Sequence, residues 1–206
     1  MPASPVFAFD LDGTVTRAEI LPAIAREAGL FEEMARLTAM TLDGAIDFET
    51  SFRRRFAMLR NVPLATVREI TANIPLDPDI TAFIAENQAS CAIVTGNLDR
   101  WVEPLTAKLG CALYCSRSEI RDGELVLASI LDKGDAVRHL ALGGKRVIAI
   151  GDAANDIPMF TAADVGIAYG GVRPPAPGLL AVADRVEHDA AALCGSLRRL
   201  RGTQRV

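Results

Sequence analysis

The hydrophobic and polar positions along this chain of 206 residues change pattern at about residue 75. The chain starts with a short apolar run, "PVFAF" at residues 5–9, which is typical of a buried strand. From residue 16 to about 75 the apolar residues recur at helical spacing, which predicts four helices and no strand. Beyond residue 75, helical segments alternate with short apolar runs. This alternation predicts the α/β class, with a doubly wound parallel sheet that has helices on both faces.

The two patterns also predict how the chain is divided into domains. We expect a catalytic core built from residues 1–15 and 76–206, interrupted after its first strand by a small helical cap domain over residues 16–75. Within the core, Asp122-Gly123 lies between two stretches of alternating polarity, which is a hairpin signal. We see no internal repeat.

Composition and charge exclude several classes of partner. Half of the residues are hydrophobic and 23% are charged, which is typical of a globular protein. The net charge of −4 gives no basic surface for nucleic acid. No apolar run reaches the roughly 18 residues that cross a bilayer, and residues 1–10 lack the cationic start of a signal peptide. We therefore expect a cytoplasmic protein with reduced cysteines, without nucleic-acid or membrane partners, and either monomeric or homodimeric.

Polar residues follow the predicted strands at the points where those strands end. They are Asp10 and Asp12, then Thr95, Gly96 and Asn97, and finally Asp152, Asn155 and Asp156. Ligands of such sheets lie beyond the carboxyl ends of the strands, so we expect these residues to converge. Several carboxylates so close together repel one another unless a cation lies between them. Oxygen ligands without His or Cys favour Mg²⁺.

The same strand ends also offer groups that bind anions. Thr95 has a hydroxyl and Gly96 an unobstructed N–H, at what we expect to be a strand-to-helix turn. Lys133 opens a predicted helix and adds a positive charge, with Lys145 as a weaker candidate. A metal, a lysine and a spare carboxylate suit phosphoryl transfer. One aspartate can attack phosphorus while a second transfers a proton.

Four stretches, "DLDGTVT", "VTGN", "DKGDAVRHL" and "GDAANDIPMF", resemble the motifs of the haloacid dehalogenase-like phosphatase superfamily, in order and with similar spacing. The resemblance implies that Asp10 is the nucleophile and Asp12 the general acid/base. It implies that Mg²⁺ is held by the Asp10 side chain, the Asp12 backbone carbonyl and Asp152. It further implies that Thr95 and Lys133 bind the phosphoryl group, with Asn155 and Asp156 supporting the metal and the lysine.

Within that superfamily the cap is similar to that of phosphoserine phosphatases. The resemblance implies that Glu19 meets the substrate ammonium, Arg55 its carboxylate, and that Phe48 shields the substrate. This chemistry is sensible in itself, because a zwitterionic amino acid needs one acid and one base, and arginine grips a carboxylate with two hydrogen bonds. The implied reaction is the Mg²⁺-dependent hydrolysis of L-phosphoserine to L-serine and phosphate through an aspartyl-phosphate.

Two departures from that family leave alternatives open. Gly13 stands where the family usually has serine, and Asn97 stands where it usually has glycine. Asn97 adds bulk and polarity where the substrate backbone would lie. The alternatives are a phosphatase for another small ester such as a sugar phosphate, or a transferase that uses an acceptor alcohol. A metal-free dehalogenase has no need of Asp12 and the later acidic pair, and a non-catalytic binding protein has no need of the reactive groups.

Overall fold

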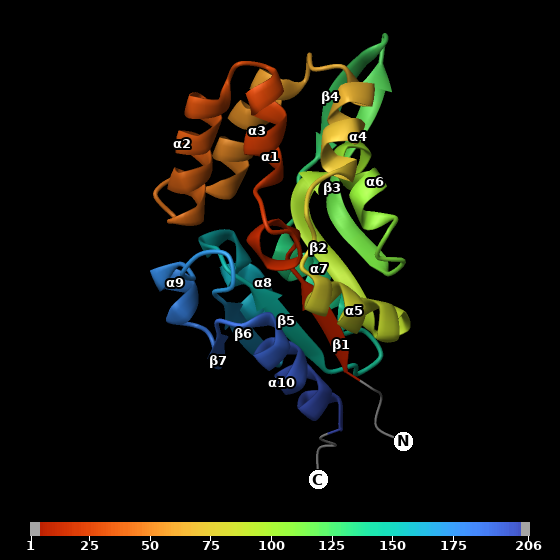
Figure 1. The fold of residues 1–206 in the computed structure, drawn as a ribbon, viewed down its shortest axis with the longest axis vertical. Coiled ribbons are helices and arrows are strands. Elements are labelled where there is room, and N and C mark those ends of the chain that lie inside the picture. The colour runs from red at the N-terminus through yellow and green to blue at the C-terminus, as the bar shows by residue number, and fades with distance from the viewer. Residues whose placement is uncertain (1–4, 203–206) are drawn as a thin grey trace.

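The computed structural model describes residues 5–202, and a single sheet runs through it (Figure 1). The strands are β1 (Val6–Phe9), β2 (Cys91–Leu98), β3 (Ala112–Arg121), β4 (Glu124–Ser129), β5 (Val147–Gly151), β6 (Val165–Tyr169) and β7 (Arg185–Glu187). Their order in the sheet is β4-β3-β2-β1-β5-β6-β7. Neighbouring strands are parallel except β3 and β4, which form the expected hairpin. This arrangement confirms the predicted α/β class.

Helices cover both faces of the sheet. They are α1 (Ile20–Glu27), α2 (Phe31–Leu42), α3 (Phe48–Leu59), α4 (Leu64–Ala72), α5 (Pro78–Glu86), α6 (Asp99–Thr106), α7 (Lys133–Leu140), α8 (Ile157–Ala162), α9 (Pro177–Leu180) and α10 (Ala190–Gly202). In β1, Phe7 and Phe9 join an apolar cluster with α5, α6 and α10. Ala8, between them, joins a second cluster with α7 and α8. This alternation is the pleat of a strand that is buried on both sides.

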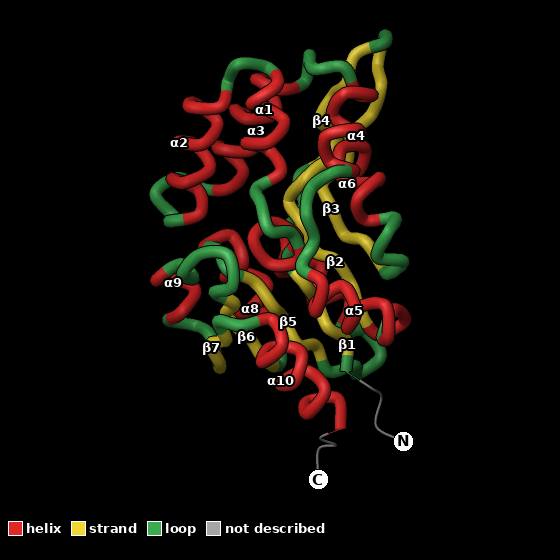
Figure 2. Tube along the Cα trace, viewed as in Figure 1, coloured by secondary structure: helices red, strands yellow, loops and turns green. Residues whose placement is uncertain are grey.

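The helices of the predicted cap lie in the segment between β1 and α5. Helices α1, α2 and α3 gather at one end of the molecule, beyond the carboxyl end of β1 (Figure 2). Helix α4 packs alongside α6. The apolar sides of α1 and α3 join the same cluster as Phe9, so the cap and the core share one buried surface. The division into two domains stays a prediction.

The order of the strands brings the three expected strand ends together. β1 pairs with β2 on one side and with β5 on the other, both in parallel. We expected the turn into the following helix at Thr95 and Gly96, but the strand continues to Leu98, which still pairs with Ser116 of β3. The Ser116 hydroxyl also donates to the carbonyl of Gly96 at 2.7 Å. Thr95 and Gly96 therefore lie in an extended segment, not at the first turn of α6.

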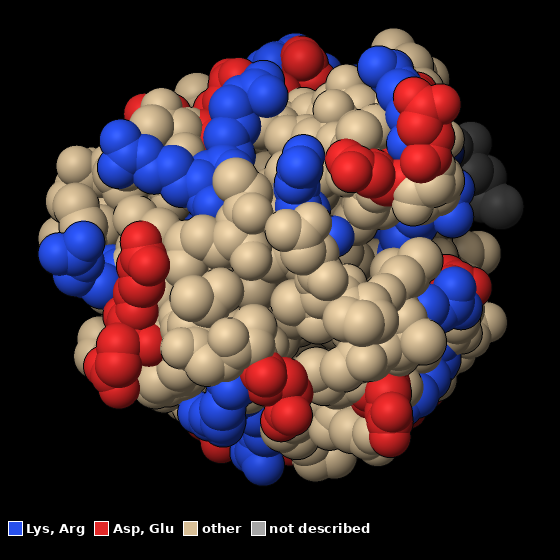
Figure 3. Space-filling view, turned by 90° about the horizontal axis from the view of Figure 1, so that it is seen from above, with Lys and Arg blue, Asp and Glu red and all other residues tan. Residues whose placement is uncertain are grey.

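The surface agrees with the mixed charge of the sequence. On the face seen from above in Figure 3, acidic and basic groups are interspersed around a largely uncharged centre. Among residues 5–202, no helix has the length and apolar character that a membrane span requires. The four cysteines are free thiols. A cytoplasmic location stays a prediction.

Candidate active site

Asp10 and Asp12 are placed by one wide turn that follows β1. The turn covers Leu11–Val15 and is closed by the Thr16 N–H, which donates to the carbonyl of Leu11 at 2.8 Å. Gly13 has a φ of +71°, and a Cβ at that position would come within 2.5 Å of Asp152 Oδ2. Glycine therefore gives the turn its left-handed residue and leaves room for Asp152.

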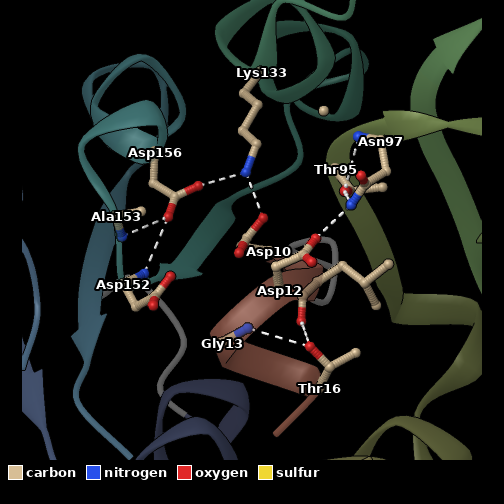
Figure 4. A network of polar contacts seen from close by, with 12 residues as sticks. Asp10, Asp12, Gly13, Thr16, Thr95, Asn97, Lys133, Asp152, Ala153 and Asp156 are labelled. Atoms are coloured by element: carbon tan, nitrogen blue, oxygen red, sulfur yellow. Dashed lines mark hydrogen bonds and ion pairs between the residues drawn. The ribbon is translucent and has the colours of Figure 1, made fainter. Parts of the chain in front are cut away.

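Lys133 links two of the carboxylates (Figure 4). It comes from the first turn of α7, and its buried ammonium donates to Asp10 Oδ1 and, at 2.6 Å, to Asp156 Oδ1. Asp156 Oδ2 accepts the N–H groups of Asp152 and Ala153, both at 3.0 Å. Both oxygens of Asp156 are thus occupied, which agrees with the supporting role expected for this residue.

The carboxylate cluster as a whole fits a hard cation, although Asp156 already accepts hydrogen bonds through both of its oxygens. Asp10, Asp152 and Asp156 each present an oxygen, and these oxygens lie within 4.8 Å of one another. Asp152 Oδ1 is buried and has no hydrogen-bond partner among residues 5–202. Burial, followed by the charge of Asp156, raises the pKa of Asp152 to about 7 and raises that of Asp10 well above its usual range. An all-oxygen set with an unpaired carboxylate oxygen suits Mg²⁺.

These pKa shifts predict how pH affects the stability of the metal-free protein. Carboxyl groups with a raised pKa stabilise the fold below about pH 4, and that contribution is lost as the pH rises through 7. With chelator, we expect the Tm to fall between pH 5 and pH 8. Mg²⁺ at about 100 times its Kd should raise the Tm by roughly 5–10 °C at pH 8 and by less at pH 5. Thermal unfolding with EDTA or Mg²⁺ at each pH measures this, and an equal Mg²⁺ effect at both values contradicts it.

Asp12 points away from that cluster, toward β2. Its Oδ2 accepts from Asn97 Nδ2 at 2.5 Å, and its Oδ1 accepts the N–H of Ile20 at 2.8 Å. The Asn97 N–H donates to Thr95 Oγ1 at 3.2 Å. Burial raises the pKa of Asp12, while the Ile20 and Asn97 hydrogen bonds oppose that rise. Asp12 therefore lies beside the Thr95 hydroxyl, and its side chain is not part of the carboxylate cluster.

Side chains of the predicted cap lie on the other side of the site, facing the strand ends. Of the three consecutive arginines in α3, only Arg55 is buried, at 6% exposure. Its Nε and Nη2 have no hydrogen-bond partner in the described chain, although its guanidinium lies 5.8 Å from the Phe48 ring centre. Phe48 covers Gly96 so closely that a Cβ at residue 96 would collide with the ring. Burial, and then the charge of Asp12, raises the pKa of Glu19 to about 8.

The predicted residues thus meet at one place. A partly open cavity of about 40 Å³ is lined by residues that include Asp10, Asp12, Glu19, Phe48, Arg55, Thr95, Gly96, Asn97, Asp152 and Asn155. Lys133 and Asp156 lie behind Asp10. Lys145, the competing lysine, is exposed. The cavity combines a carboxylate cluster, a hydroxyl and an unpaired guanidinium, which can bind a phosphate ester that also carries an anionic group.

Arg173 is a charged residue of the site that the sequence analysis missed. Its Nε donates to Asp152 Oδ2 at 2.9 Å, and its side chain is 24% exposed. It belongs to the segment "GGVRPPAPG" after β6, which we interpreted only as a loop. The signal that could have revealed it is the position of the arginine beyond the carboxyl end of a central strand.

Comparisons with known proteins agree with this geometry. The family model of haloacid dehalogenase-like hydrolases matches residues 7–161. The phosphoserine phosphatase SerB2 of Mycobacterium tuberculosis is 32% identical over 190 residues, which are 85% of this chain and 46% of that protein. The phosphoserine phosphatase of Methanocaldococcus jannaschii is 31% identical over 175 residues, 78% of this chain and 83% of the relative. This chain thus spans less than half of the first relative and most of the second.

Solved structures of phosphoserine phosphatases are also similar to this chain. A phospho-aspartyl intermediate analogue of phosphoserine phosphatase superposes with a TM-score of 0.82 at 28% identity, covering 94% of this chain and 98% of the other. A substrate-bound phosphoserine phosphatase complex also gives a TM-score of 0.82, at 27% identity, covering 97% of this chain and 99% of the other. Both similarities extend over the whole architecture, the cap helices included.

Proposed function

The chain belongs to the haloacid dehalogenase-like hydrolases, and on that premise we propose that it is a Mg²⁺-dependent phosphatase that hydrolyses L-phosphoserine through an aspartyl-phosphate. The observation that carries the substrate is the buried guanidinium of Arg55, whose Nε and Nη2 have no partner in the described chain. A buried charged donor without an acceptor is unfavourable, so a bound carboxylate satisfies it. Glu19 lines the same cavity and offers the matching acid for an ammonium group.

Asp10 carries out the first half of the proposed reaction. One of its carboxylate oxygens forms a bond to phosphorus as the bond from phosphorus to the serine oxygen breaks. Asp12 gives its proton to that serine oxygen, so that serine leaves as the neutral alcohol. The Thr95 hydroxyl and the Lys133 ammonium bind the phosphoryl oxygens. Asp10, Asp152 and the Asp12 carbonyl would hold Mg²⁺, which would supply positive charge against the phosphoryl oxygens when bound.

Asp12 carries out the second half together with water. Its carboxylate removes a proton from a water molecule, whose oxygen attacks phosphorus. The bond from phosphorus to Asp10 breaks, phosphate is released, and Asp12 is protonated again for the next cycle. Phe48 covers Gly96 and limits bulk water during the first half, which protects the intermediate from premature hydrolysis.

The test of the proposed function is phosphate release from L-phosphoserine and from a panel of small phosphate esters, with Mg²⁺ and then with EDTA. We expect turnover that requires the metal and strongly favours phosphoserine. Metal-dependent turnover that favours a sugar phosphate would support the proposed type of reaction but contradict phosphoserine as the substrate. No release from any ester would overturn the reaction itself.

Replacing Arg55 tests the substrate assignment more directly. In Arg55→Ala we expect kcat/KM for phosphoserine to fall by about 10²-fold or more, since hydrogen bonds to a charged group contribute about 1.5–3 kcal/mol each. Phosphoethanolamine has the ammonium but no carboxylate, so its kcat/KM should change little. Arg54→Ala, at the exposed neighbouring residue, is the matched control. Equal losses on both esters would argue against a carboxylate at Arg55.

A further inference from the structure

Asn97 joins two functional groups of the site through its side-chain amide. Its Nδ2 donates to Asp12 Oδ2 at 2.5 Å and to Thr95 Oγ1 at 3.3 Å. Figure 4 draws the contact between Asn97 and Asp12. The residue is 6% exposed, so little water competes for the amide. Phosphoserine phosphatases usually have a glycine at this position, and a glycine could make neither contact. Asn97 therefore provides this chain with a link between Asp12 and the phosphoryl-binding hydroxyl.

The other hydrogen bond to Asp12 comes from the cap. Its donor is the N–H of Ile20, the first residue of α1. On the C-terminal side of Asp12 the turn has hydrogen bonds of its own, from the Gly13 N–H to Thr16 Oγ1 at 3.2 Å and from the Thr16 N–H to the carbonyl of Leu11 at 2.8 Å, but these hold the backbone and not the Asp12 carboxyl group. Without Asn97, the contacts among residues 5–202 would leave the Asp12 carboxyl group with one hydrogen bond, from the first residue of a cap helix. With Asn97, it is also tied to the end of β2, a strand that pairs with β1 on one side and β3 on the other.

We propose that Asn97 is a positioning residue, which fixes the Asp12 carboxyl group beside Thr95 independently of the cap helices. This inference rests on the proposed function. In the first half-reaction the bond from Asp10 to phosphorus forms, the bond from phosphorus to the ester oxygen breaks, and the proton moves from Asp12 to that oxygen. Asn97 takes no part in bond making. It determines how close the proton donor is to the ester oxygen, and a misplacement of about 1 Å can slow a reaction about 10²-fold.

The role of Asn97 therefore predicts a dependence on the leaving group. Serine is a poor leaving group that needs the proton from Asp12, whereas acetate leaves acetyl phosphate as a stable anion without one. A badly placed Asp12 should slow the transfer of phosphate from phosphoserine to Asp10 and should hardly affect transfer from acetyl phosphate. A general disturbance of the site would slow both.

The experiment compares Asn97→Ala and Asn97→Asp with the wild type, and uses Asn73→Ala, at an exposed residue of the cap, as the matched control. Rapid-quench single turnovers measure aspartyl-phosphate formation from phosphoserine and from acetyl phosphate. For Asn97→Ala we expect a loss of about 10–100-fold with phosphoserine, at a nearly unchanged KM, and a much smaller loss with acetyl phosphate. Asn97→Asp places a like charge against Asp12 and should lose more.

Two results would overturn the role of Asn97. One is a wild-type rate with phosphoserine in Asn97→Ala, and the other is an equal loss with both phosphate donors. The wild-type enzyme separates this proposal from the one it depends on. If the wild type forms no aspartyl-phosphate from either donor, both proposals fail, but if it does and Asn97→Ala matches it, only the role of Asn97 fails.

Discussion

Asp10→Asn should lower kcat for phosphoserine by at least about 10⁴-fold, because an amide does not attack phosphorus and losses near 10⁶ are known for removed nucleophiles. Asparagine keeps the shape of the side chain and an oxygen that can accept from Lys133, so the fold should survive. Acid-quenched reactions should contain no phosphorylated protein. The matched control is Asp43→Asn, at the exposed C-terminus of α2.

One result would contradict the assignment of Asp10 as the nucleophile. Turnover by Asp10→Asn at a substantial fraction of the wild-type rate, in a preparation free of wild-type enzyme, would show that another group attacks phosphorus. Mass spectrometry of the same sample distinguishes such activity from deamidation of the new asparagine back to aspartate.

Lys133→Met should affect stability and activity together. Burial lowers the pKa of Lys133, but the charges of Asp10 and Asp156 raise it by more, so the ammonium stays protonated. Methionine fills similar space and leaves two buried carboxylates without their cation. Losing one partner of a buried ion pair destabilises a protein by about 3–5 kcal/mol. The variant also lacks the positive charge that would contact the phosphoryl oxygens, and this loss should lower kcat by about 10²–10³-fold.

Lys145→Met is the matched control for this change, because Lys145 is exposed and only twelve residues further along the chain. Urea unfolding without Mg²⁺ measures the stability of both variants, and phosphate release measures kcat. If the two variants unfold at the same urea concentration, Lys133 does not compensate the buried carboxylates. If both keep the wild-type kcat, Lys133 does not contact the transferred group.

The fold class and the family could be predicted from the sequence because their signals are local. The apolar runs of β1, β2 and β5 are strands buried on both faces. The polar residues at their ends could be placed by the rule that parallel strands share a carboxyl edge. The hairpin at Asp122-Gly123 is confirmed, with φ values of 52° and 83° that suit those residues. The family is confirmed by the family model, and the α/β architecture by the solved structures.

Other features depend on contacts between distant residues, which no local pattern contains. The extension of β2 through Asn97 depends on pairing with β3, so the expected turn at Gly96 was wrong. The contact of Asn97 with Asp12 joins residues 85 positions apart. Arg173 reaches Asp152 only because its loop folds back over the end of the sheet. The roles of the individual site residues stay predictions until the variants are measured.

The position of Phe48 over Gly96 also bears on which step limits the rate of turnover. The cavity beside Phe48 has room for roughly three water molecules. If an amino acid phosphate can enter only when Phe48 leaves Gly96, that side chain has to move away and return in each catalytic cycle. If that movement is slower than the chemistry, turnover will fall as solvent viscosity rises. The movement of a single aromatic side chain, Phe48, would then limit the rate of turnover.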